Sequence, residues 1–382
     1  MSSQASTELY KLAVGMVGQI VLVEFDGKDF NIADRYTRDL SSPLHLLYKE
    51  PNLLYVADQL SLDTSVFKLS QTQTEMSHIS SARGTLGGRS LTFNVDKTRL
   101  VELSCMDRAG IDIWDSSAAD GSLSLIKTLD IPDSGDGYFQ YHMYECVLDP
   151  TGRFFVVVYS GFEDYGGYRL LIIDSKDDRY EITDSIPLDD KLGVRRIAFF
   201  EDGARTFLVV FAHESQELIL YEVKYSADSF SLTDMIQRLK TEPRTNRYGQ
   251  KWDVTANDLV VAPNNRDLYT LNRAELADPA AITHYMFRRS KGDGNPELRM
   301  LEWSPGYGWG ADAMCLSADG KYAFIGHHTN PDLANGFGLV AFRCLPTTGV
   351  LLPAPLAAIQ FHDIAFENDF GARFGPEFIC EI

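Results

Sequence analysis

The stretch ECVLDPTGRFFVVV, residues 145–158, is the pattern that decides the fold. Residues 145–148 lead into a turn at Asp149-Pro150-Thr151-Gly152, and a run of Phe and Val follows that turn. Pro and Gly favour turns, whereas Val and Phe favour strands, so the stretch predicts two antiparallel strands joined by a tight connection. A further apolar run at 170–173 predicts a third strand beside them.

This unit of strand, turn, strand and strand recurs about every 50 residues along the chain. Its first strands begin near Leu44, Arg89, Glu145, Arg196, Asp258 and Asp312. The N-terminal segment supplies second and third strands without a first, and the C-terminal segment 376–382 supplies a lone strand. Joined, the two ends complete a seventh unit, and such closure removes exposed strand edges.

The sequence therefore predicts an all-β chain folded as a seven-bladed β-propeller, a single domain over 1–382 that is closed by the N- and C-terminal strands in one blade. The blades are expected near 10–40 with 374–382, 42–84, 87–131, 142–188, 193–239, 256–305 and 310–360. A pair of packed β-sandwiches is the alternative architecture. Residues 230–239 are expected to include a short helix, because their apolar spacing departs from strict alternation.

Composition excludes several partners. Lys and Arg number 35 against 54 Asp and Glu, which gives a formal net charge of −19. Such a chain offers no electrostatic attraction to nucleic acid or to an anionic membrane surface. Its apolar runs are of strand length, and the first residues do not resemble a signal peptide. The five cysteines form no CxxC pair, which predicts reduced thiols and a cytoplasmic location.

Motifs for cofactor and metal chemistry are not found. The chain contains no Walker loop, no GxGxxG after a strand, no GxSxG and no HExxH. We therefore expect neither a cofactor nor a metal ion. The adjacent His327 and His328 follow a predicted second strand, where they are interpreted as polar residues of a pocket rather than metal ligands.

Three segments resemble the lactonase-type seven-bladed propellers, a family that includes bacterial 6-phosphogluconolactonase and the fungal carboxymuconate lactonizing enzyme. These segments are 145–154, 257–273 and 347–351. The fungal enzyme's pattern of one His, one Glu and two Arg falls here on Tyr144, His213, Gly310 and Arg195, so that only one arginine is retained. The loss of an arginine predicts a pocket for an uncharged, partly aromatic ligand.

Such a pocket suits the divergent fungal hetero-Diels–Alderases of tropolone–sesquiterpenoid biosynthesis, which this resemblance implies as relatives. Their implied reaction is cofactor-independent: a hydroxymethyl tropolone or phenol loses water to give an o-quinone methide, which then adds to a humulene-like alkene. The first function hypothesis is therefore a small-molecule cyclase of fungal secondary metabolism. The candidate catalytic residues are His213, Tyr144, His142 and Arg195, and the candidate substrate-binding residues are Trp309, Phe374, Tyr307, Asn257, His327 and His328.

Two other hypotheses stay open. A lactonase or carboxymuconate-lactonizing isomerase would be marked by arginines that converge on the channel, with Glu145 or Glu214 among them. A non-enzymatic interaction propeller would show a shallow channel and exposed apolar patches. Arg195 also has a structural interpretation, in which it pairs with an acid such as Asp258. The sequence leaves the oligomeric state open.

Overall fold

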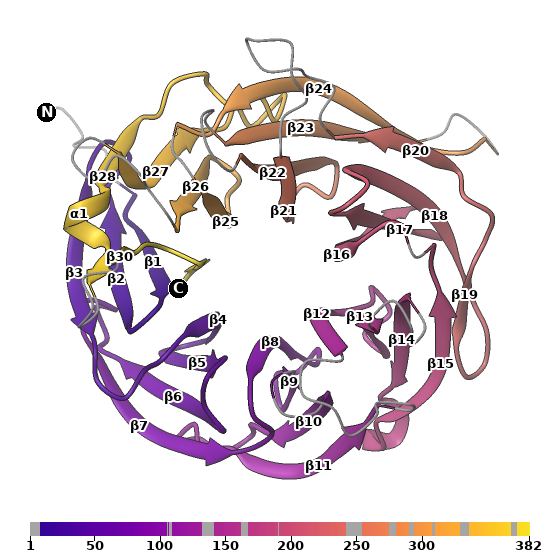
Figure 1. Cartoon of the computed structure of the whole chain (residues 1–382), viewed down its shortest axis with the longest axis horizontal. Helices are drawn as coiled ribbons and strands as arrows, with labels where there is room; N and C mark the ends of the chain where they lie inside the picture. The colour runs from indigo at the N-terminus through magenta and orange to yellow at the C-terminus, as the bar shows by residue number, and fades with distance from the viewer. Residues whose placement is uncertain are drawn as a thin grey trace, which may run out of the picture.

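The structure is a computed structural model of the chain. It describes residues 8–104, 106, 109–131, 141–161, 167–189, 191–241, 254–274, 280–289, 294–307, 310–328, 336–367 and 373–382. Within these ranges, seven antiparallel sheets of four or five strands stand in a ring (Figure 1). The first strand is nearest the centre in six of them, and the C-terminal strand Phe378–Glu381 is nearest the centre in the sheet that joins the two chain ends. The observed fold is therefore the seven-bladed β-propeller that the repeat predicts.

The strands of the first four sheets are short and consecutive. The first sheet contains β1 (Tyr10–Met16), β2 (Gln19–Phe25), β3 (Phe30–Tyr36) and, from the other end of the chain, β31 (Phe378–Glu381). The second contains β4 (Pro43–Lys49), β5 (Leu53–Asp58), β6 (Asp63–Leu69) and β7 (Met76–Arg83). The third contains β8 (Gly88–Phe93), β9 (Arg99–Ser104), β10 (Gly110–Asp115) and β11 (Ser124–Asp130). The fourth contains β12 (Tyr141–Leu148), β13 (Phe154–Gly161), β14 (Tyr168–Asp174) and β15 (Glu181–Pro187).

The remaining sheets follow the same order. The fifth contains β16 (Val194–Asp202), β17 (Arg205–Ala212), β18 (Glu217–Tyr225), β19 (Phe230–Leu232) and β20 (Gln237–Lys240). The sixth contains β21 (Val254–Val261), β22 (Asp267–Ala274), β23 (Ala281–Arg288) and β24 (Glu297–Pro305). The seventh contains β25 (Ala311–Leu316), β26 (Tyr322–His327), β27 (Phe337–Arg343) and β28 (Ala357–Gln360). A short hairpin of β29 (Phe366–Glu367) and β30 (Arg373–Phe374), the 3₁₀ turn η1 (Lys176–Asp178) and the single-turn helix α1 (Phe361–Ile364) complete the elements.

The two ends of the chain close the ring. Strand β31 pairs with β1 so that Leu12 faces Glu381 and Gly15 faces Phe378. Figure 1 shows the C-terminus at the inner edge of the same blade that β1, β2 and β3 form. The ends of the chain thus meet in one blade, which leaves no open edge between the first blade and the last.

Apolar side chains fill the seams between blades. The middle strand β5 is buried along its whole length, whereas the outer strand β7 contains no buried residue. Between the fifth and sixth blades, the rings of Phe200 and Phe287 stack with centroids 4.8 Å apart. Sheet-on-sheet burial of this kind explains why the strand sequences read as nearly continuous apolar runs.

The helix predicted within 230–239 is wrong. Residues Phe230–Leu232 and Gln237–Lys240 form the strands β19 and β20, and both pair with β18. The outer strand of this blade is thus split in two, and each piece pairs with a different half of β18. Pairing with an existing strand edge outweighs local helical spacing in so short a segment.

A buried carboxyl group, Glu102 on β9, makes the stability of the fold depend on pH. Its side chain accepts hydrogen bonds from Thr64 and, at 2.9 Å, from the indole N–H of Trp114. Burial raises the pKa of Glu102 to about 7, with the charge of Asp112 acting in the same direction. The folded protein therefore retains a proton that the unfolded chain releases, and this contribution to stability is lost as the pH rises through 7.

We expect Glu102→Gln to mimic the protonated acid at every pH. At pH 8 the variant should exceed the wild type in unfolding free energy by up to about 3 kcal/mol, and at pH 4.5 the two should agree. Urea unfolding followed at both pH values measures the difference. The exposed Glu75→Gln serves as the control, and a difference that does not change with pH would contradict the assignment.

No helix among the described residues is both long and apolar enough to span a membrane.

Candidate functional site

The inner strands of six blades share one irregularity, a β-bulge near their first residues. In each, one residue has no partner on the neighbouring strand, and the register shifts by one position there. These bulged residues are Leu44, Arg89, Tyr144, Arg195, Asn257 and Asp312. A bulge turns one side chain out of the regular alternation, and bulges are frequent beside active sites.

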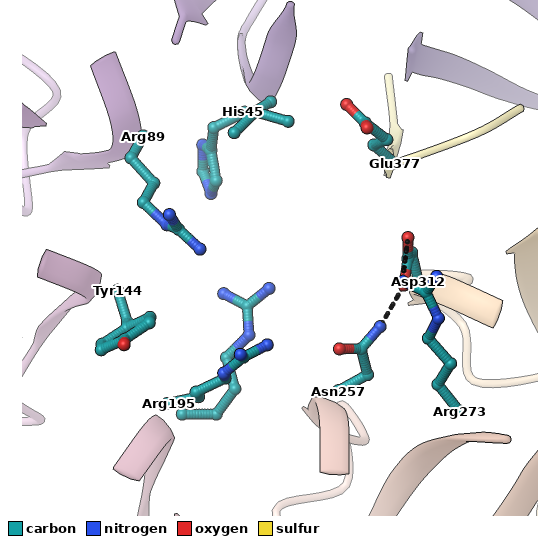
Figure 2. A pocket seen from close by; sticks show the side chains of 10 residues that line it. His45, Arg89, Tyr144, Arg195, Asn257, Arg273, Asp312 and Glu377 are labelled. Atoms are coloured by element: carbon teal, nitrogen blue, oxygen red, sulfur yellow. Dashed lines mark hydrogen bonds and ion pairs between the residues drawn. The ribbon is translucent and has the colours of Figure 1, made fainter. Parts of the chain in front are cut away.

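All six bulged residues line one cavity of about 210 Å³ at the centre of the ring. Glu377, which directly precedes β31, lines the cavity from the first blade, the one blade without a bulged residue in this set. The other lining residues are His45, Arg196 and Arg273. Figure 2 shows these side chains converging from different blades on a common space. Every blade therefore contributes to a single site.

In four of the six bulged blades, the side chain of the residue after the bulge accepts a hydrogen bond from the backbone of the next blade. The backbone N–H of Ile197 donates to Glu145 at 2.6 Å, and that of Met314 donates to Asp258 at 2.9 Å. Ser90 and His45 accept in the same way from Cys146 and Leu91. The bulged residue thus lines the cavity, whereas the next residue contacts the neighbouring blade; His45 and Arg196 do both. The repeated bond holds the inner strands of neighbouring blades together beside the cavity.

One side of the cavity is cationic. The guanidinium carbons of Arg89 and Arg195 lie 5.2 and 5.6 Å from the ring centroid of Tyr144, within the range of cation–π interaction. Within the described part of the chain, neither arginine has a carboxylate partner. Burial lowers the pKa of Arg195, and the charge of Arg89 acts in the same direction. Two neighbouring cations without a carboxylate partner among the described residues have the chemistry that holds an anion through charge-assisted hydrogen bonds.

The third arginine, Arg196, is held by two carboxylates. Its nitrogens lie 3.4 Å from Glu145 and 3.3 Å from Asp258. Burial raises the pKa of Glu145 to about 7, against the opposing charge of Arg196. Arg196 therefore bridges the fourth and sixth blades and keeps two buried acids paired.

The opposite side of the cavity is acidic and hydrogen-bonded. Arg273 lies 3.1 Å from Asp312, and the amide of Asn257 donates to Asp312 and to the carbonyl of Ala311. Burial raises the pKa of Asp312. Beside this group, Nδ1 of His328 lies 3.0 Å from Oε1 of Glu377. The cavity is thus polarised, with Arg89 and Arg195 on one wall and the carboxylates of Asp312 and Glu377 on the other (Figure 2).

The structure brings three residues named from the sequence together: Tyr144, Arg195 and Asn257 all line the cavity. His142 lies on the same strand as Tyr144, with ring centroids 6.0 Å apart, but it is not a lining residue. Burial lowers its pKa, and the charges of Arg89 and Arg195 add to that effect. His328 contacts the cavity-lining Glu377 but does not line the cavity itself. The ring centroids of Phe374 and His328 are 5.7 Å apart.

The remaining residues named from the sequence lie elsewhere. His327 is fully buried, with Nε2 3.1 Å from the carbonyl oxygen of Gly306, and burial lowers its pKa to about 4. His213 follows β17 and is half-buried, and Tyr307 is 37% exposed; neither lines the cavity. Trp309 is outside the described residues. Successive side chains along a strand point to opposite faces, so the side chain of His327 points away from the face on which His328 lies. This alternation explains why His327 is buried away from the cavity.

The lining also differs from the expected uncharged pocket, since four arginines reach it. Sequence reasoning missed Leu44, His45, Arg89, Asp312 and Glu377 as lining residues. A usable signal was present, because each bulged residue stands five or six positions before the turn of its repeat. The pairing expected for Arg195 with Asp258 is made by the adjacent Arg196 instead. Among the described residues, no three His, Cys, Asp or Glu side chains are grouped as a metal site would require.

Comparisons with known proteins give a consistent fold. The family model described as "Lactonase, 7-bladed beta-propeller" matches residues 11–333. The structure is similar to the periplasmic gluconolactonase of Pseudomonas aeruginosa, with a TM-score of 0.72 and 18% identity over 92% of this chain and 96% of that one. A putative 6-phosphogluconolactonase of Bacteroides fragilis superposes with a TM-score of 0.72 and 15% identity over the whole of both chains. The search of curated proteins found no match.

Proposed function

Because this chain belongs to the family of seven-bladed β-propeller lactonases, we propose that it is an enzyme that opens or closes a lactone ring in a substrate carrying an anionic group. The observation that carries the proposal is the pair Arg89 and Arg195, two cations on one wall of the central cavity that have no carboxylate partner in the described part of the chain.

Charge balance supports an anionic substrate. The chain as a whole is strongly acidic, so an attractive site for an anion has to be built locally. Burial of a guanidinium is unfavourable unless a hydrogen-bonded anion compensates for the lost hydration. A carboxylate or phosphate held by Arg89 and Arg195 would supply that compensation through charge-assisted hydrogen bonds. The substrate itself would thus complete the electrostatics of the cavity.

The rest of the lining supports the chemistry of an ester carbonyl. Ring opening needs donors that stabilise the developing oxyanion and a group that transfers a proton. The Tyr144 hydroxyl and the two guanidiniums provide donors on one wall, and carboxylates face them from the other. Lactone formation uses the same groups in reverse.

A second hypothesis is the hetero-Diels–Alder cyclase of a fungal pathway, working in the cytoplasm. The Tyr144 hydroxyl and the two guanidiniums near its ring favour this hypothesis, because such donors would polarise the carbonyl of an o-quinone methide. A humulene-like partner, however, requires an apolar wall, and among the described lining residues Leu44 is the one aliphatic side chain. The lactone reaction is therefore the better supported of the two.

The experiment is a product assay with the purified protein. One arm offers five- and six-membered lactones with and without a carboxylate or phosphate, and the release of acid is followed by titration at constant pH. The other arm offers a hydroxymethyl tropolone with humulene and uses chiral chromatography with mass detection. We expect opening of the anionic lactones above the rate in heat-inactivated protein. A single enantiomer of cycloadduct without lactone opening would overturn the proposal in favour of the cyclase.

A further inference from the structure

Glu377 occupies the seventh place in the ring of cavity-lining residues, on the wall opposite Arg89 and Arg195 (Figure 2). Its backbone is closely fixed. The N–H of Glu377 donates to the carbonyl of Gly15 at 2.9 Å, and the N–H of Gly375 donates to the carbonyl of His328 at 2.8 Å. A Cβ at Gly375 would overlap the carbonyl oxygen of His327, so this approach of the two segments requires glycine.

The carboxylate of Glu377 is incompletely satisfied. Oε1 lies 3.0 Å from Nδ1 of His328, and the two side chains are 15% and 16% exposed. Oε2 is buried and has no hydrogen-bond partner among the described residues. A buried carboxylate oxygen without a donor is costly in a folded protein, and at the wall of a cavity it indicates a place for a donor on the ligand.

His328 is placed to hold that carboxylate. Burial by itself lowers the pKa of His328, but its closeness to Glu377 and the charges of Asp312 and Glu377 outweigh it, although Arg273 opposes them, and the pKa is raised. When it is protonated, the imidazole forms an ion pair with Oε1, and Oε2 is left without a donor among the described residues. The carboxylate of Asp312 forms an ion pair with Arg273 and accepts a hydrogen bond from Asn257. Among the described residues, Glu377 has no arginine partner.

We propose that Glu377 is the acid–base group of the cavity and that His328 is its positioning residue. This inference rests on the proposed lactone reaction. In ring opening, Glu377 accepts a proton from a water molecule as the water oxygen bonds to the lactone carbonyl carbon. The tetrahedral intermediate then breaks its bond to the ring oxygen, and Glu377 returns the proton to that oxygen. One water is consumed, a hydroxy acid forms, and its new carboxyl group releases a proton to bulk water.

The test compares Glu377→Gln with the wild type on an anionic lactone that the wild type opens. General acid–base catalysis contributes about 100- to 10,000-fold, so kcat should fall by at least about a hundredfold while KM stays within about threefold. Glu367→Gln is the matched control: it lies in the same C-terminal segment, is exposed and pairs with Arg373. Thermal unfolding establishes that each variant is folded.

His328→Asn gives a second readout that does not depend on the folding of the first variant. Loss of the imidazolium charge beside Glu377 should move the acid limb of the kcat/KM profile to higher pH, which a purely structural role would not do. A kcat for folded Glu377→Gln within about threefold of the wild type would overturn this inference and leave the lactone reaction standing. If the acid limb of the kcat/KM profile lies at the same pH in His328→Asn as in the wild type, the positioning role of His328 is overturned. A wild type that opens no lactone would overturn both the inference and the proposed function.

Discussion

Replacement of both Arg89 and Arg195 by glutamine is expected to raise the KM for an anionic lactone by about 100-fold to 10,000-fold. Each charge-assisted hydrogen bond to an anion contributes about 1.5–3 kcal/mol, and the two guanidiniums act on the same group. Both arginines stack on Tyr144 and lack carboxylate partners in the described chain, so their removal leaves no protein charge unpaired. The effect should therefore fall on binding rather than on folding.

Initial rates with a carboxylated lactone measure this effect. The double substitution Arg83→Gln with Arg288→Gln is the matched control, because it makes the same change in net charge at two exposed positions. We expect that control to retain the wild-type KM. An unchanged KM in the Arg89 and Arg195 variant would show that the anion binds elsewhere.

The second large effect concerns stability. Arg196→Met is expected to lower the unfolding free energy by about 3–5 kcal/mol, because it leaves Glu145 and Asp258 buried without their shared cation. The loss should be greatest near pH 8 and smaller near pH 5, since a carboxyl group whose pKa already lies at about 7 can take up a proton once the arginine is gone.

Urea unfolding at the two pH values measures this loss. Arg195→Met is the matched control. It removes the same charge from the neighbouring residue, which has no carboxylate partner in the described part of the chain. We expect that variant to lose much less stability. Equal losses in the two variants, or a loss at position 196 that does not depend on pH, would contradict the assigned bridge.

The repeat predicted the fold because propeller blades are local. Each blade is built from consecutive strands, so short apolar runs and turn residues are sufficient to indicate it. The split outer strand of β19 and β20 was not predicted, because its conformation depends on the edge of β18 rather than on its own sequence.

The site was harder to predict for a geometric reason. Its residues come from seven different blades, and a one-residue bulge decides how two neighbouring side chains are directed. Arg195 and Arg196 are the same residue type and both line the cavity, yet only Arg196 is held by two acids. The resemblance to the fungal enzyme indicates Tyr144 and Arg195, but its pattern has no counterpart for Arg89 or Glu377. The distance from the turn of each repeat marks all six bulged residues.

In the proposed function, the cavity binds an anionic lactone through Arg89 and Arg195. The most direct test of this claim is the ratio of kcat/KM for two matched substrates, a five-membered lactone bearing a carboxylate and the same lactone bearing a carboxamide. The wild type should prefer the carboxylate by at least about a hundredfold, the value expected from two charge-assisted hydrogen bonds. The variant without the two arginines should lose that preference. Equal rates for the two lactones in the wild type would contradict the claim.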